Sequence, residues 1–377
     1  MKTLFTHGHL IIDGNREYID GALLVDDDKI LDVFVHTNHL PTDLDFDQEI
    51  NLNGHIVMPG FFDSHIHGGF SYNFNNLNID ELNKLSYLLA KKGTTSFLTT
   101  LTNNDNLIKQ LELLNNIETT YAKMMGIHLE GPFINPSYRG AIDKEYLLEP
   151  DIDYLDNILN INNHIKQMTI APELKDSSLI MKKLKENNIK VMLGHSGALK
   201  EDIKEDYDGF THLFNATRGL HHRDISLVNL AFADKKYVEI IADGIHLDLN
   251  ILKLIYKNID RNHLLLISDG LSMAGLADGN YIFENSEVIK DGLKIIRKED
   301  NKLCGGASFI VDGLKNMYKI GASYNDLLLM SSLNAYRLYD LDKQYGSLIK
   351  GKYADIVVLD DELNLLFTYL KGEIINA

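Results

Sequence analysis

Apolar, β-prone segments at five places in this sequence each end in side chains that can bind a metal ion. The candidates are His65 and His67 in FFDSHIH, Glu130 in GIHLEG, His195 in VMLGHSG, His212 in GFTHLFN and Asp269 in LLLISDG. Three histidine or carboxylate ligands with one open position are typical of catalytic zinc, and the same donors suit iron, cobalt or manganese. The pattern therefore predicts a metal-dependent hydrolase.

The spacing of His65 and His67 puts both rings on the same side of an extended strand. Such a pair holds a divalent metal, or forms a hydrogen-bonded structural pair. Glu130 is followed by Gly131 and Pro132, which turn the chain out of the strand directly after the carboxylate. A buried carboxylate needs a positive partner, which is either a cation held by histidines or a lysine or arginine.

Asp269 has three open roles: metal ligand, helix cap or proton carrier. We favour the proton carrier, because a carboxylate beside a metal-activated water can accept its proton and pass it to a leaving amine. His246, His222 and Arg223 lie in polar loops and suit hydroxyl or phosphate groups. A solvated loop with a surface arginine explains Arg223 as well.

Two further polar side chains are weaker candidates. His128 lies two residues before Glu130 and deeper in its strand, and Asp63, two residues before His65, is compatible with a structural role.

Eight β-like runs carry these residues: 55–63, 94–100, 123–130, 166–172, 189–195, 209–214, 237–243 and 263–269. Residues 79–93 and 177–188 show the 3.6-residue period of amphipathic helices. Repeated units of this kind predict an α/β fold with a (β/α)₈ TIM-type barrel, whose chemistry lies at the C-terminal ends of its strands. The long connections 133–159 and 271–310 are predicted to be functional loops.

Both ends of the chain consist of short β-like runs joined by polar turns. We therefore expect a small β-sandwich domain built from residues 1–54 and 345–377. The barrel domain would then comprise residues 55–344.

The composition limits the possible partners. Lys and Arg number 37 against 54 Asp and Glu, which gives a net charge of −17, and no stretch concentrates the basic residues. Nucleic acid is therefore not an expected partner, and an anionic substrate would need a local cationic pocket. A single cysteine excludes an internal disulfide, and neither a signal peptide nor an apolar span of ~20 residues is evident. We expect a cytoplasmic protein with no membrane partner.

Taken together, the motifs resemble the amidohydrolase superfamily and, within it, the N-acetylglucosamine-6-phosphate deacetylases. The matching segments are MPGFFDSHIHGG, GIHLEGPFINPSYRGA, GHSGA, THLFNATRGLHHRD, ADGIHLD, SDGLSMAGLADGNY, LCGGASFIVDGL and GSLIKGKYADIVVLD. The resemblance implies metal-dependent hydrolysis of N-acetylglucosamine 6-phosphate to glucosamine 6-phosphate and acetate, in amino-sugar catabolism and cell-wall sugar recycling. Relatives such as dihydroorotases differ, because they carry a lysine at the position of Glu130.

The resemblance also implies roles for single residues, with Asp269 as acid and base. The implied metal ligands are Glu130, His195 and His212 for a principal ion, with His65 and His67 as a second position. One or two ions per subunit both fit the resemblance, and Glu130 would bridge a second ion. The implied substrate contacts are Ala141, Asn215, Ala216, His222, Arg223, His246, Leu303, Cys304 and Gly305. Similar proteins are typically homodimers, so we expect a homodimer in which His222 and Arg223 reach the neighbouring active site and complete its anion pocket.

The sequence departs from the family pattern at three places. HHRDIS lacks the usual proline, Gly306 replaces a serine, and Thr217 ends the FNAT segment. None is a proposed ligand, but the first two can change loop order and phosphate affinity. Two alternatives stay open: an amidohydrolase that uses this site on another cyclic amide or amino sugar, and a metal-free scaffold that keeps the barrel for oligomerisation.

Overall fold

The computed structural model describes residues 1–283 and 286–377, and its centre is a parallel eight-stranded sheet. In chain order the strands are β6 (Phe61–Ile66), β9 (Thr94–Thr102), β10 (Lys123–Glu130), β11 (Ile165–Ile170), β12 (Lys190–Leu193), β13 (Gly209–Phe210), β14 (Tyr237–Ile241) and β15 (Leu264–Ile267). A parallel bridge between Ile66 and Gly270 brings the last strand back to the first. The sheet is thus a nearly closed barrel, and the predicted TIM-type fold is confirmed.

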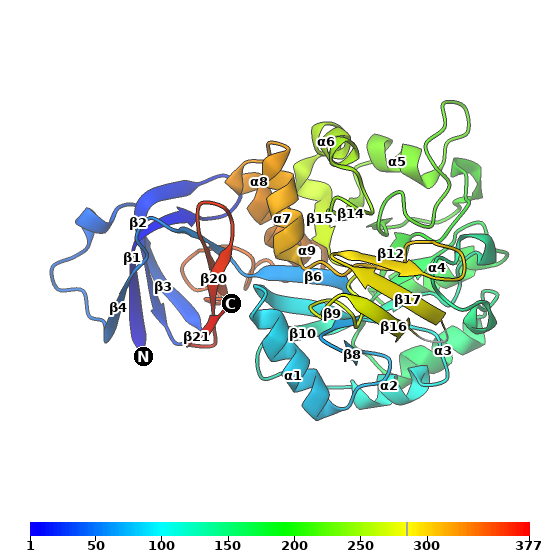
Figure 1. Ribbon diagram of the computed structural model, residues 1–377, viewed down its shortest axis with the longest axis horizontal. Coiled ribbons are helices and arrows are strands. Elements are labelled where there is room, and N and C mark those ends of the chain that lie inside the picture. The colour runs from blue at the N-terminus through cyan, green and yellow to red at the C-terminus, as the bar shows by residue number, and fades with distance from the viewer. Residues whose placement is uncertain (284–285) are drawn as a thin grey trace.

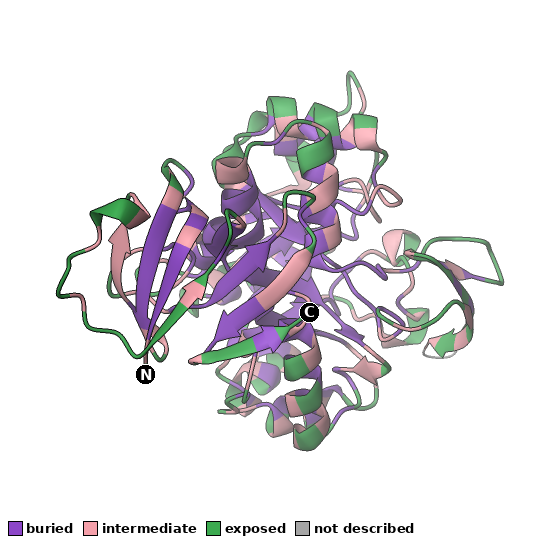
Figure 2. Cartoon of the chain, turned by 60° about the vertical axis from the view of Figure 1, so that its left-hand side comes forward, coloured by how far each residue is buried: buried purple, intermediate pink, exposed green. Residues whose placement is uncertain are grey.

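Helices cover the outside of this barrel, and most of them show one buried and one exposed side (Figure 2). They are α1 (Ile79–Ala90), α2 (Leu107–Leu113), α3 (Ile152–Ile161), α4 (Ser177–Glu186), α5 (Leu227–Ala233), α6 (Leu249–Asn258), α7 (Ile310–Lys319), α8 (Tyr324–Leu328) and α9 (Asn334–Leu338), with a π-helical turn η6 (Leu329–Leu333) before the last. The two helices predicted from periodicity are α1 and α4. Among the described residues, no helix has both the length and the apolar character needed to cross a bilayer.

The predicted strand at residues 55–63 is wrong as a single element. Strand β5 (Ile56–Pro59) pairs within the sheet formed by the chain ends, whereas β6 belongs to the barrel. Gly60 lies between them, and a Cβ there would come within 2.2 Å of the Thr95 side chain. The chain passes from one sheet to the other at Gly60, and only glycine allows the close approach to Thr95 that this crossing requires.

Residues from both chain ends form one further sheet, which lies beside the barrel (Figure 1). Its strands are β1 (Lys2–Ile11), β2 (Glu17–Asp26), β3 (Lys29–Phe34), β4 (Gln48–Asn51), β5, β19 (Ile356–Leu359), β20 (Leu365–Leu370) and β21 (Glu373–Asn376). The ring of Phe5 in β1 meets that of Tyr369 in β20 at 5.2 Å between centroids, although two strands separate β1 from β20. The expected sandwich is therefore one sheet that curls over its own core. The domain limits at residues 54 and 345 stay a prediction.

Residues 271–310, expected as a loop, contain a three-stranded antiparallel meander. Its strands are β16 (Gly279–Phe283), β17 (Ser286–Asp291) and β18 (Lys294–Arg297). Val288 and Ile295 are buried in one cluster with Leu271 of the segment that follows β15. This packing attaches the meander to the chain directly after Asp269.

Candidate active site

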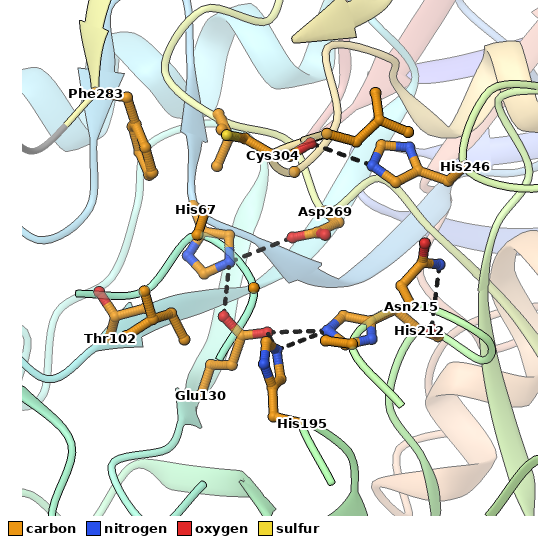
Figure 3. A pocket seen from close by; sticks show the side chains of 17 residues that line it. His67, Thr102, Glu130, His195, His212, Asn215, His246, Asp269, Phe283 and Cys304 are labelled. Carbon is orange, nitrogen blue, oxygen red and sulfur yellow. Dashed lines mark hydrogen bonds and ion pairs between the residues drawn. The ribbon is translucent and has the colours of Figure 1, made fainter. Parts of the chain in front are cut away.

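The predicted metal ligands come together at the C-terminal ends of the barrel strands, and all are buried. Glu130 ends β10, while His195 and His212 follow β12 and β13. Glu130 Oε1 lies 3.0 Å from His195 Nε2 and 3.2 Å from His212 Nε2, and the two ring nitrogens are 3.0 Å apart (Figure 3). These three atoms form one compact group of possible ligands.

A second group of possible ligands adjoins the first. It consists of His65 and His67 together with Asp269, whose Oδ1 lies 3.4 and 3.3 Å from their Nε2 atoms. Glu130 contacts both rings as well, with Oε1 at 3.3 Å from His65 and Oε2 at 3.3 Å from His67. Glu130 thus lies between the two groups, and Asp269 belongs to the second.

The donor chemistry of both groups fits a divalent cation. Four-coordinate zinc with ligands at about 2.1 Å separates neighbouring ligand atoms by roughly 3.4 Å, close to the spacing of the first group. In the second group, the buried Nε2 of His65 makes no well-aligned hydrogen bond among the described residues, although Glu130 and Asp269 oxygens lie 3.3 and 3.4 Å away. A buried ring nitrogen that faces two carboxylates is costly unless a cation or proton occupies its lone pair.

In the absence of a cation, the pKa shifts in this site favour a protonated His67 and ionised Glu130 and Asp269. Burial opposes ionisation of Glu130, but its electrostatic interactions with the neighbouring His195 and His65 hold its pKa well below the ordinary value. Burial also opposes a charge on His67, but hydrogen bonds to Asp269 and Glu130 raise its pKa to about 9. The pKa of Asp269 is lowered, because His65 and His67 outweigh its burial. Both carboxylates are therefore ready to bind a cation.

The backbone turns sharply at several of these strand ends. His195, His212 and Asp269 have φ angles of 48°, 28° and 48°, in the left-handed region that non-glycine residues rarely adopt. Each such residue costs about 1–2 kcal/mol. Strain of this kind is common at functional sites, where the surrounding structure holds the side chain in a required direction.

Two contacts that the sequence analysis missed orient the histidine rings. Glu239 Oε2, in β14, lies 3.3 Å from His65 Nδ1, and the carbonyl of Tyr138 lies 2.9 Å from His195 Nδ1. Both contacts direct the Nε2 atoms toward the ligand groups. The signal for Glu239 was an acidic residue inside the apolar run YVEIIAD; nothing in the sequence marked Tyr138.

His128 faces a different part of the barrel interior. Its two ring nitrogens lie 3.2 Å from Thr100 Oγ1 and 2.8 Å from Thr169 Oγ1. Burial lowers its pKa well below the ordinary value, so the ring is neutral. His128 is not part of either ligand group.

A pocket opens onto the ligand groups. Seven expected substrate contacts line it together with His67, Glu130 and Asp269: Ala141, Asn215, Ala216, His246, Leu303, Cys304 and Gly305. The sequence analysis missed Thr102, Ile142, Leu271 and Phe283, which also line it.

His246 is held in this pocket at both ring nitrogens. Its Nδ1 lies 2.7 Å from Asp243 Oδ2, and its Nε2 lies 3.2 Å from the carbonyl of Cys304 (Figure 3). Burial opposes a positive ring, but Asp243 raises the pKa of His246 above its ordinary value. The side chain is therefore a fixed hydrogen-bond donor at the pocket wall.

His222 and Arg223 are not brought to the pocket within this chain. Both are exposed, and Arg223 lines a separate surface hollow with Lys200 and Lys204.

Known proteins resemble this chain over nearly its whole length. Residues 56–375 match the model of the amidohydrolase family. An N-acetylglucosamine-6-phosphate deacetylase of Bacillus subtilis (strain 168) is 30% identical over 97% of this chain and 95% of its own length. An N-acetylgalactosamine-6-phosphate deacetylase of Escherichia coli O157:H7 is 29% identical, covering 85% of this chain and 87% of the relative. The crystal structure of N-acetylglucosamine-6-phosphate deacetylase from Thermotoga maritima is 28% identical with a TM-score of 0.85, covering 99% of this chain and 100% of that chain.

Proposed function

The chain belongs to the amidohydrolase family, and we propose that it removes the acetyl group of N-acetylglucosamine 6-phosphate to give glucosamine 6-phosphate and acetate. The main support is that Glu130 contacts both buried groups of possible metal ligands. These groups lie in a pocket that seven of the expected substrate-binding residues line. Relatives named for this reaction support the choice of substrate.

The family and the donor set indicate a divalent metal cofactor. We propose that Glu130, His195 and His212 hold one ion and that His65 and His67 hold a second, each being zinc, iron, cobalt or manganese. A bound ion would polarise the amide carbonyl and make a nearby water more acidic.

Asp269 is proposed to move the proton of the reaction. Its lowered pKa keeps the carboxylate ionised at neutral pH, so it starts the cycle as a base. It accepts a proton from the attacking water and then delivers that proton to the leaving nitrogen.

His246 is proposed to bind the carbonyl or a sugar hydroxyl. Asp243 holds the ring through Nδ1, so Nε2 is the donor, and the substrate would share or replace its present contact with the Cys304 carbonyl at 3.2 Å. A donor fixed in advance stabilises charge that develops on the carbonyl oxygen without further rearrangement.

Acetate release from N-acetylglucosamine 6-phosphate, measured with and without a chelator, tests the function. We expect release that the chelator abolishes and added divalent metal restores. N-acetylgalactosamine 6-phosphate belongs in the same assay, because one relative is named for that epimer. Metal-loaded protein that releases acetate from neither sugar phosphate would contradict the proposal.

Assembly and location are also proposals. We propose a cytoplasmic homodimer in which His222 and Arg223 reach the partner's pocket. Their exposure, together with a pocket lining that contains no lysine or arginine among the described residues, supports this arrangement.

A further inference from the structure

The proposed substrate carries a phosphate, yet the catalytic pocket of this chain has no lysine or arginine among its described lining residues. The net charge of −17 repels an anion at long range. A phosphate is held best by charge-assisted hydrogen bonds from arginine or lysine. Any such group that the substrate-binding subunit itself supplies must lie next to the pocket.

A second hollow of about 360 Å³ adjoins the catalytic pocket, and we call it the basic annex. Arg139, Arg297 and Lys302 line the basic annex. It shares three lining residues with the catalytic pocket, namely Gly140, Ala216 and Leu303. A sugar bound in the pocket can thus extend a substituent into the basic annex.

Arg139 is fixed relative to the ligand groups by its neighbours in sequence. The carbonyl of Tyr138 contacts His195 Nδ1, and a Cβ on Gly140 would lie 3.3 Å from the same ring. The Arg139 guanidinium donates to the carbonyl of Ile142, which lines the catalytic pocket. The charge of Arg139 therefore lies at the border between the two hollows.

Lys302 is carried by a turn that an ion pair holds in place. Arg297 binds both carboxylate oxygens of Asp300, at 3.0 and 2.8 Å, and its backbone N–H donates to the carbonyl of Lys302 at 2.9 Å. Asp300 balances the charge of Arg297. The Lys302 side chain is 73% exposed and lies 3.5 Å from Asp300, so it can turn toward an anion.

We propose that Arg139 and Lys302 bind the phosphate of the sugar phosphate in the basic annex, within the same chain, and that the pair of Arg297 and Asp300 positions Lys302. This inference rests on the proposed function. Arg139 and Lys302 would be specificity residues of the subunit that binds the sugar phosphate. They would act in addition to the partner's Arg223, which we expect at the same pocket.

Steady-state kinetics of Lys302→Glu and Arg139→Ala test the inference. Removing either charge-assisted hydrogen bond to the phosphate should raise the KM for N-acetylglucosamine 6-phosphate roughly tenfold or more. The kcat should stay within about twofold, because the phosphate does not take part in amide cleavage. Activity of Lys302→Glu on unphosphorylated N-acetylglucosamine should not change.

Lys294→Glu is the matched control, because Lys294 is exposed on the same meander but does not line the basic annex. It makes the same change in net charge and should leave KM unaltered. An unchanged KM in Lys302→Glu and Arg139→Ala, with an active wild type, would overturn the inference. A wild type that cleaves neither sugar phosphate would instead overturn the proposed function.

Arg139→Ala can also disturb His195 through the adjacent backbone. Metal content is therefore measured for each variant, and Arg139→Lys should recover most of the KM. If Arg139→Ala loses metal, the result for Lys302→Glu decides, because the Lys302 side chain is 73% exposed and its ion pair is with Asp300, which is not a proposed metal ligand.

Discussion

Glu130 is the residue on which both ligand groups depend. Its two oxygens lie 3.0 to 3.3 Å from four histidine nitrogens, and its lowered pKa keeps it ionised. Replacing Glu130 with Gln removes the bridging charge, so we expect loss of bound metal and of activity together. Elemental analysis of the purified variant measures the first and acetate release the second. A variant that keeps its full metal content would contradict the bridging role.

Asp269→Asn separates proton transfer from metal binding at the principal position. The amide cannot act as a base, and we expect kcat to fall by about 10²- to 10⁴-fold. The ion held by Glu130, His195 and His212 should remain, because Asp269 belongs to the other group. Elemental analysis and kcat are measured on the same preparation. Full turnover in Asp269→Asn would remove this residue from the mechanism.

Metal binding at the position of His65 and His67 should depend on pH. The pKa of His67 is raised to about 9, so below that pH the metal-free ring carries a proton that the ion must displace. Affinity for a second ion should therefore rise as pH increases toward about 9. Burial opposes a charge on His65, but Glu130 and Asp269 raise its pKa well above the ordinary value, so this ring must lose a proton as well. Glu130, ionised throughout the neutral range, adds no pH dependence there.

Calorimetric titration with metal in two buffers of different ionisation enthalpy measures the protons released. At about pH 7 the apparent heat of the second binding event should differ between the buffers. The same heat in both buffers would show that no proton is displaced and would contradict the expected histidine charge.

Strand ends decide the geometry of the site at the scale of elements. The backbone N–H of Asp269 donates to the carbonyl of His65 in β6. Gly270 forms parallel bridges with Ile66 and with Gly306. A Cβ at Gly306 would lie 2.3 Å from the carbonyl oxygen of Ser268. A serine here, as the family resemblance led us to expect, cannot be accommodated without a shift of the strand end.

Gly306→Ala should therefore displace Asp269. Overpacking of this kind typically costs about 1–3 kcal/mol, and we expect a lower Tm together with a lower kcat. Gly219→Ala is the control, because a Cβ there meets no heavy atom within 4 Å. Thermal unfolding and acetate release measure both variants. Equal behaviour of the two would contradict the close packing behind Asp269.

Two parts of the fold could not be predicted from the sequence: the meander of β16 to β18, and the division of residues 55–63 between two sheets. The meander of β16 to β18 was missed, because its strands are short and bury few residues. Strand β16 has no fully buried residue, whereas Val288 of β17 and Ile295 of β18 pack in one cluster with Leu271. The run at residues 55–63 looked like one strand, because β5 and β6 are both apolar and nothing local shows that they join different sheets.

Subunit assembly is the question at the scale of the whole molecule. If Arg223 acts on the partner's pocket, a mixed dimer of Arg223→Ala and Asp269→Asn subunits contains one complete site. Equal mixing by unfolding and refolding should then recover about a quarter of wild-type activity at low substrate, because half of the dimers are mixed and half of their sites are complete. No recovery, with a dimer confirmed by light scattering, would mean that Arg223 does not act across the interface.

The sequence by itself determined the order of the barrel strands and the residues that end them, because strand period, helix period and turn residues are local properties of the chain. It also marked Glu130, His195 and His212 as candidates. Only the tertiary structure decided that their atoms lie 3.0 to 3.2 Å apart and that Asp269 joins His65 and His67. Barrel closure brings together residues that are far apart in sequence, and their separation depends on register and left-handed turns that no local pattern encodes.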